Sequence, residues 1–131
     1  MLREIGGAGQ VAFKAAHVVV VGAGGIGCPA LLYLAAAGIG RLTVIDDDRV
    51  DVSNLQRQVL FGDADVGALK AEAAAAALVR TNPHVVVTGV TERLCPDNVD
   101  RLIDGADAIL DGCDNFATRL TVSDAATRAR V

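Results

Sequence analysis

The sequence predicts an α/β domain with a mostly parallel, doubly wound sheet, and three observations support this. Short β-branched segments alternate with longer helix-prone segments along the 131 residues, an order typical of parallel strands joined by right-handed crossovers. The strand segments are continuous apolar runs, as expected for strands covered on both faces. A glycine-rich turn, GAGGIG, follows the first strand segment. The length fits one domain over residues 1–131, since domains usually have about 100–200 residues.

The first β–α–β unit lies in the N-terminal third. The run HVVVV (His17–Val21) is β-branched and bounded by glycine, which predicts a buried strand. Residues Gly25–Ala37 predict a helix, with Pro29 tolerated in its first turn because the N–H groups there lack helical partners. Gly38 ends this helix, and RLTVID (Arg41–Asp46) predicts the second strand.

The later elements continue the alternation. A polar loop over residues 47–67 precedes an alanine-rich segment with strong helix propensity. The predicted elements are a short helix over Asn54–Leu60, a helix over Ala68–Asn82, a strand over His84–Val90, a short helix over Pro96–Ile103, a strand over Ala106–Asp114 and a last helix over Asn115–Arg130. Ligands of such sheets bind beyond the carboxyl ends of the strands. The segments 22–27, 46–57 and 111–115 are therefore expected to lie together.

Composition excludes several classes of protein. The chain has 12 basic and 16 acidic residues without a run of Lys or Arg, which argues against a nucleic-acid partner. Cys28, Cys95 and Cys113 form no Cys-x-x-Cys pair, which argues against a disulfide framework or a complete zinc site. We expect Cys28 and Cys113 to be core residues, because free cysteine is often buried. A reducing, cytoplasmic environment follows.

The apolar stretch from Ala15 to Gly40 resembles a membrane span by hydropathy alone. Four glycines and Pro29 interrupt its middle, so a strand, a turn and a buried helix explain it better. The N-terminus has no basic-then-apolar secretion signal. We therefore expect a soluble protein with no membrane partner.

The glycine turn and the end of the second strand predict a nucleotide site. Gly22, Gly24, Gly25 and Gly27 match G-x-G-x-x-G between a strand and a helix, where free backbone N–H groups can face phosphate. Asp46 follows Gly22 by 24 positions (46 − 22), close to the spacing of an acid that binds ribose hydroxyls. Asp48 has a weaker claim to the same site, and Asp47 is more simply a solvated loop charge.

Two positively charged residues come after the second predicted strand, and a dinucleotide-binding site does not need positive charge there. Arg57 and Lys70 suit a polyphosphate whose leaving group gains charge. Asp111, Asp114 and Asn115 end the fourth strand, and carboxylates beside phosphates are natural Mg²⁺ ligands. An alternative role for Asp111 is a hydrogen bond to the glycine turn. Together these residues describe an ATP site.

The segments VVGAGGIGCPALLYLAAAGIGRLTVIDDDRVDVSNLQRQVLF, VGALKAEAAAAALVRTNP and DGCDN occur in this order. In them the chain resembles the ThiF/MoeB/HesA adenylyltransferases, bacterial relatives of ubiquitin-activating enzymes. The resemblance implies a Rossmann-like, ThiF-type NAD/FAD-binding fold. It also implies adenylylation of the C-terminal glycine of a small ubiquitin-fold sulfur-carrier protein by ATP and Mg²⁺, with release of pyrophosphate, in thiamine- or molybdopterin-type sulfur transfer.

The resemblance also assigns roles to residues. Arg57, Lys70 and Asp114 would be catalytic, and Asp114 would hold Mg²⁺. The implied nucleotide-binding set is Gly22, Gly24, Gly25, Gly27, Asp46, Asp48, Ser53, Asn54, Gln56, Arg57, Lys70, Asp114 and Asn115. Within this set, Gly25 would lie at the phosphates and Asp46 at the ribose.

Family members are longer than this chain and share active sites between subunits. We therefore expect a truncated fold, a fragment of a longer protein that forms a homodimer at full length. Two alternatives remain at this stage. One is an NAD(P)-binding Rossmann oxidoreductase, which shares the glycine turn and Asp46. The other is a non-catalytic nucleotide-binding module.

Overall fold

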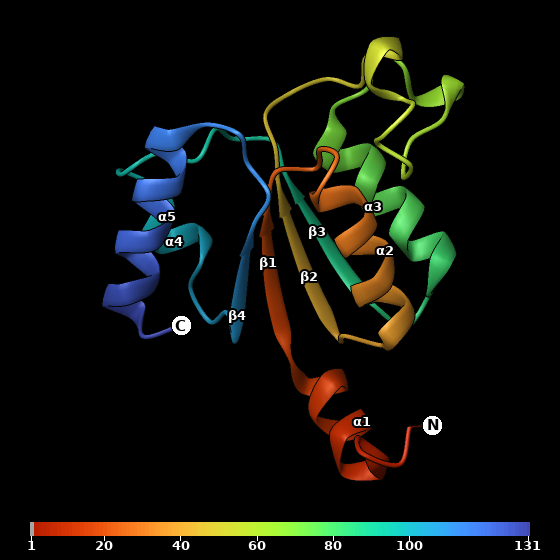
Figure 1. Cartoon of the computed structure of the whole chain (residues 1–131), viewed down its shortest axis with the longest axis vertical. Helices are drawn as coiled ribbons and strands as arrows, with labels where there is room; N and C mark the ends of the chain where they lie inside the picture. The colour runs from red at the N-terminus through yellow and green to blue at the C-terminus, as the bar shows by residue number, and fades with distance from the viewer. Residues whose placement is uncertain (1) are drawn as a thin grey trace.

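A computed structural model describes residues 2–131 and contains a four-stranded parallel sheet (Figure 1). The strands are β1 (His17–Val21), β2 (Arg41–Ile45), β3 (Val86–Val90) and β4 (Ala108–Asp111). Their order in the sheet is β3-β2-β1-β4, and every neighbouring pair is parallel. This arrangement confirms the predicted doubly wound α/β architecture.

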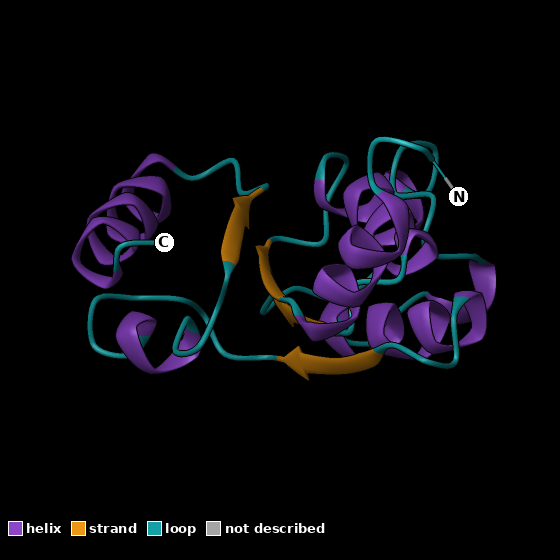
Figure 2. Cartoon of the chain, turned by 90° about the horizontal axis from the view of Figure 1, so that it is seen from below, coloured by secondary structure: helices purple, strands orange, loops and turns teal. Residues whose placement is uncertain are grey.

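Helices cover both faces of the sheet. The helices are α1 (Gly6–Ala15), α2 (Gly27–Ala37), α3 (Lys70–Thr81), α4 (Val99–Leu102) and α5 (Phe116–Ala129). Helices α2 and α3 lie on one side of the sheet, and α4 and α5 on the other (Figures 1 and 2). Helix α1 extends from the end of the sheet where the strands begin.

The side chains of β1 explain its unbroken apolar sequence. All five of its residues are buried. Val18 and Val20 pack into the cluster beneath α2 and α3, while Val19 and Val21 pack into the cluster beneath α4 and α5. A strand covered on both faces needs apolar side chains, as at Val18–Val21. The buried His17 ring is instead hydrogen-bonded with the Thr43 hydroxyl and the Gly105 carbonyl.

The start of α2 is held against the turn that precedes it. Gly22 has a φ of 91°, which side chains other than glycine rarely adopt. A Cβ atom at Gly27 would lie 2.9 Å from the carbonyl carbon of Gly22 and would overlap its oxygen. The two glycines therefore allow the strand and the helix to meet within a very short turn.

The apolar stretch Ala15–Gly40 divides into β1, a turn and α2, as expected from its glycines. Within residues 2–131, no helix is both long and apolar enough to span a bilayer.

The prediction of a helix over Asn54–Leu60 is wrong. The loop instead contains two short 3₁₀ turns, at Val52–Asn54 and Asp63–Asp65. The carboxylate of Asp51 accepts a hydrogen bond from the Ser53 backbone N–H and starts the first turn. Leu60 and Phe61 are buried in the core beneath α2 and α3. This anchoring in the core, rather than helix propensity, shapes the segment.

Other differences concern ends of elements and one missed helix. Helix α1 was not predicted, because its sequence GGAGQVAFKA contains three glycines, which disfavour helix. The predicted ranges 25–37, 41–46, 68–82, 84–90, 96–103, 106–114 and 115–130 all exceed the observed elements by one to several residues. The largest difference is in β4, which ends at Asp111, so Gly112 to Asp114 form a loop.

Candidate functional site

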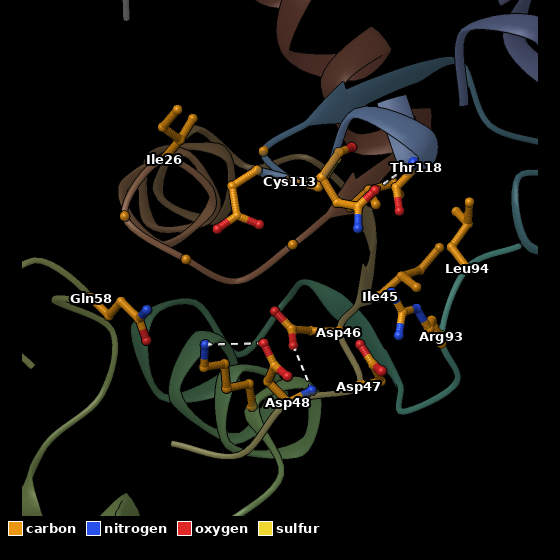
Figure 3. A pocket seen from close by; sticks show the side chains of 18 of the residues that line it. Ile26, Ile45, Asp46, Asp47, Asp48, Gln58, Arg93, Leu94, Cys113 and Thr118 are labelled. Carbon is orange, nitrogen blue, oxygen red and sulfur yellow. Dashed lines mark hydrogen bonds and ion pairs between the residues drawn. The ribbon is translucent and has the colours of Figure 1, made fainter. Parts of the chain in front are cut away.

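A cavity of about 650 Å³ lies at the carboxyl ends of the strands (Figure 3). Its volume falls within the range of about 300–1,000 Å³ that is usual for small-molecule sites. It is lined by Val21, Gly22, Gly24, Gly25, Ile26, Ile45, Asp46, Asp47, Asp48, Asn54, Arg57, Gln58, Lys70, Glu92, Arg93, Leu94, Gly112, Cys113, Asp114, Asn115, Thr118 and Arg119. The three segments expected to converge from the sequence therefore do so.

Most of the predicted nucleotide-binding residues line this cavity, and three do not. Gly27 is buried where α2 meets the glycine turn. Ser53 and Gln56 are exposed on the loop after β2 and lie outside the cavity wall. The Ser53 hydroxyl donates to the Asp51 carboxylate at 2.6 Å, and this bond lowers the pKa of Asp51. Ser53 thus shapes the loop.

Asp46 joins the glycine turn to the end of β2. One of its carboxylate oxygens accepts a hydrogen bond from the Ala23 N–H at 2.8 Å, and the other accepts one from the Asp48 N–H at 2.8 Å. A carboxylate has about four lone-pair sites, so both oxygens retain the capacity to accept a hydroxyl hydrogen bond. The group predicted to face a ribose is therefore already fixed in position.

Lys70 reaches the cavity from the first residue of α3. Its backbone N–H donates to the Asp48 carbonyl at 2.9 Å, and a bridge between Arg49 and Leu69 holds the loop beside the helix. The side chain is 7% exposed, and its ammonium lies 3.8 Å from the carboxylate of Asp48. The lysine is thus a largely buried cation whose partner is an exposed acid.

Arg57 lies over the glycine turn. Its guanidinium donates to the Asn54 amide oxygen at 2.9 Å. A Cβ atom at Gly25 would stand 3.3 Å from Cδ of Arg57, so the absence of a side chain at Gly25 lets the arginine lie close to the backbone. The arginine remains exposed, which leaves its other N–H groups free for an anion.

The loop after β4 forms the opposite wall. Asp111 accepts a hydrogen bond from the Cys113 N–H at 3.0 Å. The hydrogen bond from Asp111 to the glycine turn, which the sequence suggested as an alternative, is not found among the described residues. Asn115 caps α5 by accepting from the Thr118 N–H at 3.2 Å. Arg119 donates two hydrogen bonds, of 3.1 and 2.9 Å, to the Cys113 carbonyl. These bonds place the exposed carboxylate of Asp114 at the edge of the cavity.

Cys28 and Cys113, both expected in the core, differ in how deeply they are buried. Cys28 is buried, as predicted, and burial raises the pKa of its thiol to about 11. Cys113 is only half-buried and lines the cavity, so its placement in the core was partly wrong. Burial, and then the hydrogen bond with Asp111, raise the pKa of its thiol. Neither cysteine has the depressed pKa of a reactive thiolate.

Several carboxylates could hold a divalent cation with the help of a ligand. Asp46, Asp47 and Asp48 bring one oxygen each to within 4.8 Å of one another. Asp114, the predicted magnesium ligand, lies in the wall contributed by the loop after β4. Such a donor set fits Mg²⁺, which binds one or two carboxylates and completes its shell with phosphates and water.

Sequence reasoning missed part of the wall: Gln58, Glu92, Arg93, Leu94, Thr118 and Arg119. The rule that ligands bind at strand carboxyl ends applies equally to β3, and it would have indicated residues 92–94. Gln58 stands in the same SNLQRQ segment as Asn54 and Arg57. Arg119 gives no sequence signal, because its contact with the Cys113 carbonyl depends on how α5 packs.

Comparison with known proteins agrees with this geometry. The sequence pattern of the ThiF family matches residues 1–131. The probable adenylyltransferase/sulfurtransferase MoeZ of Mycobacterium tuberculosis is 51% identical over 129 residues, which cover 98% of this chain and 33% of that protein. The molybdopterin-synthase adenylyltransferase of Salmonella typhimurium is 51% identical over 119 residues, covering 91% of this chain and 48% of that protein.

A solved structure of a related protein has the same fold as this chain. The E. coli tRNA N6-threonylcarbamoyladenosine dehydratase TcdA, in complex with ATP, superposes with a TM-score of 0.94 at 35% sequence identity, over 98% of this chain and 54% of that one. The same protein has also been solved with AMP. This chain spans half or less of the length of the two adenylyltransferases above. The match over residues 1–131 and the similarity to these adenylyltransferases show that the chain belongs to the ThiF family.

Proposed function

We propose that this chain is the ATP-binding part of an adenylyltransferase that activates the C-terminal carboxylate of a ubiquitin-fold sulfur-carrier protein. One observation carries the proposal: Lys70 and Arg57 line the same cavity as the glycine turn and Asp114. A generic dinucleotide site has no need of two cations there. The names of the related adenylyltransferases and the ATP-bound relative support the same conclusion.

The cavity has distinct ends that suit the parts of ATP. Ile45 and Leu94 lie at one end, Gln58 and Ile26 at the other, and Asp46 between them (Figure 3). The end with Ile45 and Leu94, where Arg93 also lies, fits a nucleobase, and the part lined by the glycine turn, Arg57 and Lys70 fits phosphates. Asp46 then stands where the ribose would lie. ATP spans the cavity in this orientation.

The reaction requires one bond to form and one to break. An oxygen of the carrier's terminal carboxylate attacks the α-phosphorus, and the bond from that phosphorus to the bridging oxygen of the β-phosphate breaks. Pyrophosphate leaves with the negative charge that develops on that oxygen. Lys70 and Arg57 stabilise this charge, which is the main contribution a protein makes to such a transfer.

Asp114 would hold magnesium, which would neutralise part of the phosphate charge. Asn54 orients the Arg57 guanidinium through their hydrogen bond. Arg119 keeps the loop of Asp114 in place by its two bonds to the Cys113 carbonyl. Both act by holding a charged group at the position where phosphate arrives. In the full-length protein we expect a homodimer.

Pyrophosphate exchange into ATP tests the proposal. The 131-residue chain is expected to bind ATP with Mg²⁺ and to catalyse carrier-dependent exchange poorly, because it covers only part of the length of its relatives. A full-length relative carrying the same site residues serves as the positive control. NAD⁺ binding tighter than ATP binding would favour an oxidoreductase. Binding of ATP without exchange in any longer form would favour a non-catalytic module.

A further inference from the structure

The wall of the cavity contains a buried polar group with no partner. Gln58 is 3% exposed. Its side-chain oxygen is buried and accepts no hydrogen bond from any residue in the range 2–131. Buried polar atoms are nearly always paired in folded proteins, because leaving one unpaired costs free energy. An unpaired amide oxygen in the wall of a binding cavity therefore needs a donor that arrives or moves.

Lys70, a hydrogen-bond donor with N–H groups still available, lines the same cavity. The Lys70 ammonium has three N–H groups. Among the residues described, its one ion pair is with Asp48, at 3.8 Å, beyond hydrogen-bonding distance. The Asp48 side chain is 72% exposed, so solvent competes for it. An incoming phosphate can therefore draw the ammonium away from Asp48 at little cost.

Gln58 and this ion pair face each other across one end of the cavity. Figure 3 shows the Gln58 amide directed into the cavity from its loop, toward the side where Asp48 forms the dashed ion pair. We propose that Gln58 is a positioning residue for Lys70. When phosphate binds, the Gln58 oxygen accepts one N–H of the ammonium, and the other two point toward phosphate oxygens. The inference rests on the proposed function insofar as phosphates must reach Lys70.

The chemistry limits how Gln58 can act. An amide oxygen is only an acceptor, and an ionised phosphate oxygen has no proton to donate. The buried oxygen of Gln58 therefore cannot bind phosphate itself, and it acts only through a cation, whereas a direct contact from the amide NH2 to phosphate would persist without Lys70. Lys70 is a movable point charge on a flexible stem, so fixing its direction changes how well it meets an anion. If the oxygen is the group that acts, loss of Gln58 should matter only while Lys70 is present.

A double-mutant cycle tests this dependence. Titration calorimetry on the 131-residue chain measures Kd for ATP and for inorganic tripolyphosphate. Gln58→Met, which matches the side chain in length but lacks both the acceptor and the N–H donors of the amide, is expected to raise both Kd values about tenfold, the scale of a hydrogen bond to a charged group. In a Lys70→Met background, the same change is expected to alter Kd less than twofold. Gln10→Met, on α1, controls for the glutamine-to-methionine change.

Each outcome decides the matter. The inference would be overturned if the increase in Kd of the double variant equals the product of the increases in the two single variants. An unchanged Kd in Gln58→Met would also overturn it. A chain that binds tripolyphosphate with the expected coupling but ignores ATP would refute the proposed function and leave the inference standing. Binding of neither probe would overturn the inference, because no anion then reaches Lys70. If Gln58→Met does not fold, Gln58→Asn, one methylene too short, replaces it with the same expectation.

Discussion

Replacing Gly27 by alanine tests the close contact between the glycine turn and α2. The new Cβ would lie 2.9 Å from the Gly22 carbonyl carbon and closer still to its oxygen. The obstacle is backbone at both sides, so no side chain can rotate away. Overpacking usually costs about 1–3 kcal/mol, and we expect the upper end, about 3 kcal/mol, because the contact is rigid. For a domain of this size that loss lowers Tm by about 10 °C.

Gly24→Ala provides the matched control. A Cβ at Gly24 meets nothing within 4 Å, and its φ is not positive. Its free energy of unfolding is expected to stay within about 0.5 kcal/mol of the unchanged protein, or to rise slightly because alanine restricts the unfolded chain. Urea unfolding followed by circular dichroism gives both values. If the two variants are equally stable, the contact does not limit the turn as described.

Three further predictions concern charge and hydrogen bonding in the site. Asp46→Asn should lower the free energy of unfolding by about 1–2 kcal/mol, since it removes a charged acceptor of two N–H groups, whereas the exposed Asp47→Asn should change it little in urea titration. Burial raises the pKa of the Cys28 thiol from 9.0 to about 11, so the folded state holds this proton more tightly than the unfolded chain does. The stability that the protonated thiol contributes is therefore complete below about pH 9 and is lost as the pH rises toward 11. Urea unfolding across this range should show a smaller decline in Cys28→Ala, and equal declines would contradict the assignment. Arg119→Ala should speed amide exchange in the loop after β4 and raise the Kd for ATP about tenfold. Arg128→Ala, also on α5, breaks an exposed ion pair with Asp100 of α4 and should do neither.

The strands and the glycine turn were predictable because their signals are local. A run such as His17–Val21 is best satisfied by burial on two faces, and GAGGIG provides a turn in which Gly22 and Gly27 could not carry side chains. These signals located the carboxyl edge of the sheet. Once that edge was located, most residues of the cavity wall could be predicted, including Asp46 and Lys70.

The remaining features depend on contacts that no local pattern contains. Helix α1 has poor propensity, and Gly40 donates to the Phe13 carbonyl near its end while Phe13 packs against the core. Arg119 lines the cavity from α5, which packs beside β4. The SNLQRQ segment shows a dense group of polar residues, but only the structure separates the buried Gln58 from the exposed Gln56.

The anchoring of the loop after β2 has a consequence for the kinetics of binding. Asn54 and Arg57 lie on a segment whose far end, Leu60 and Phe61, is part of the hydrophobic core. That segment cannot open without exposing these side chains to water, which costs about 1.5–3 kcal/mol for each of them. The site is therefore preorganised, and a ligand loses little affinity to ordering of the backbone. Association should be governed by diffusion and charge, with the entropy loss confined to side chains such as Arg57.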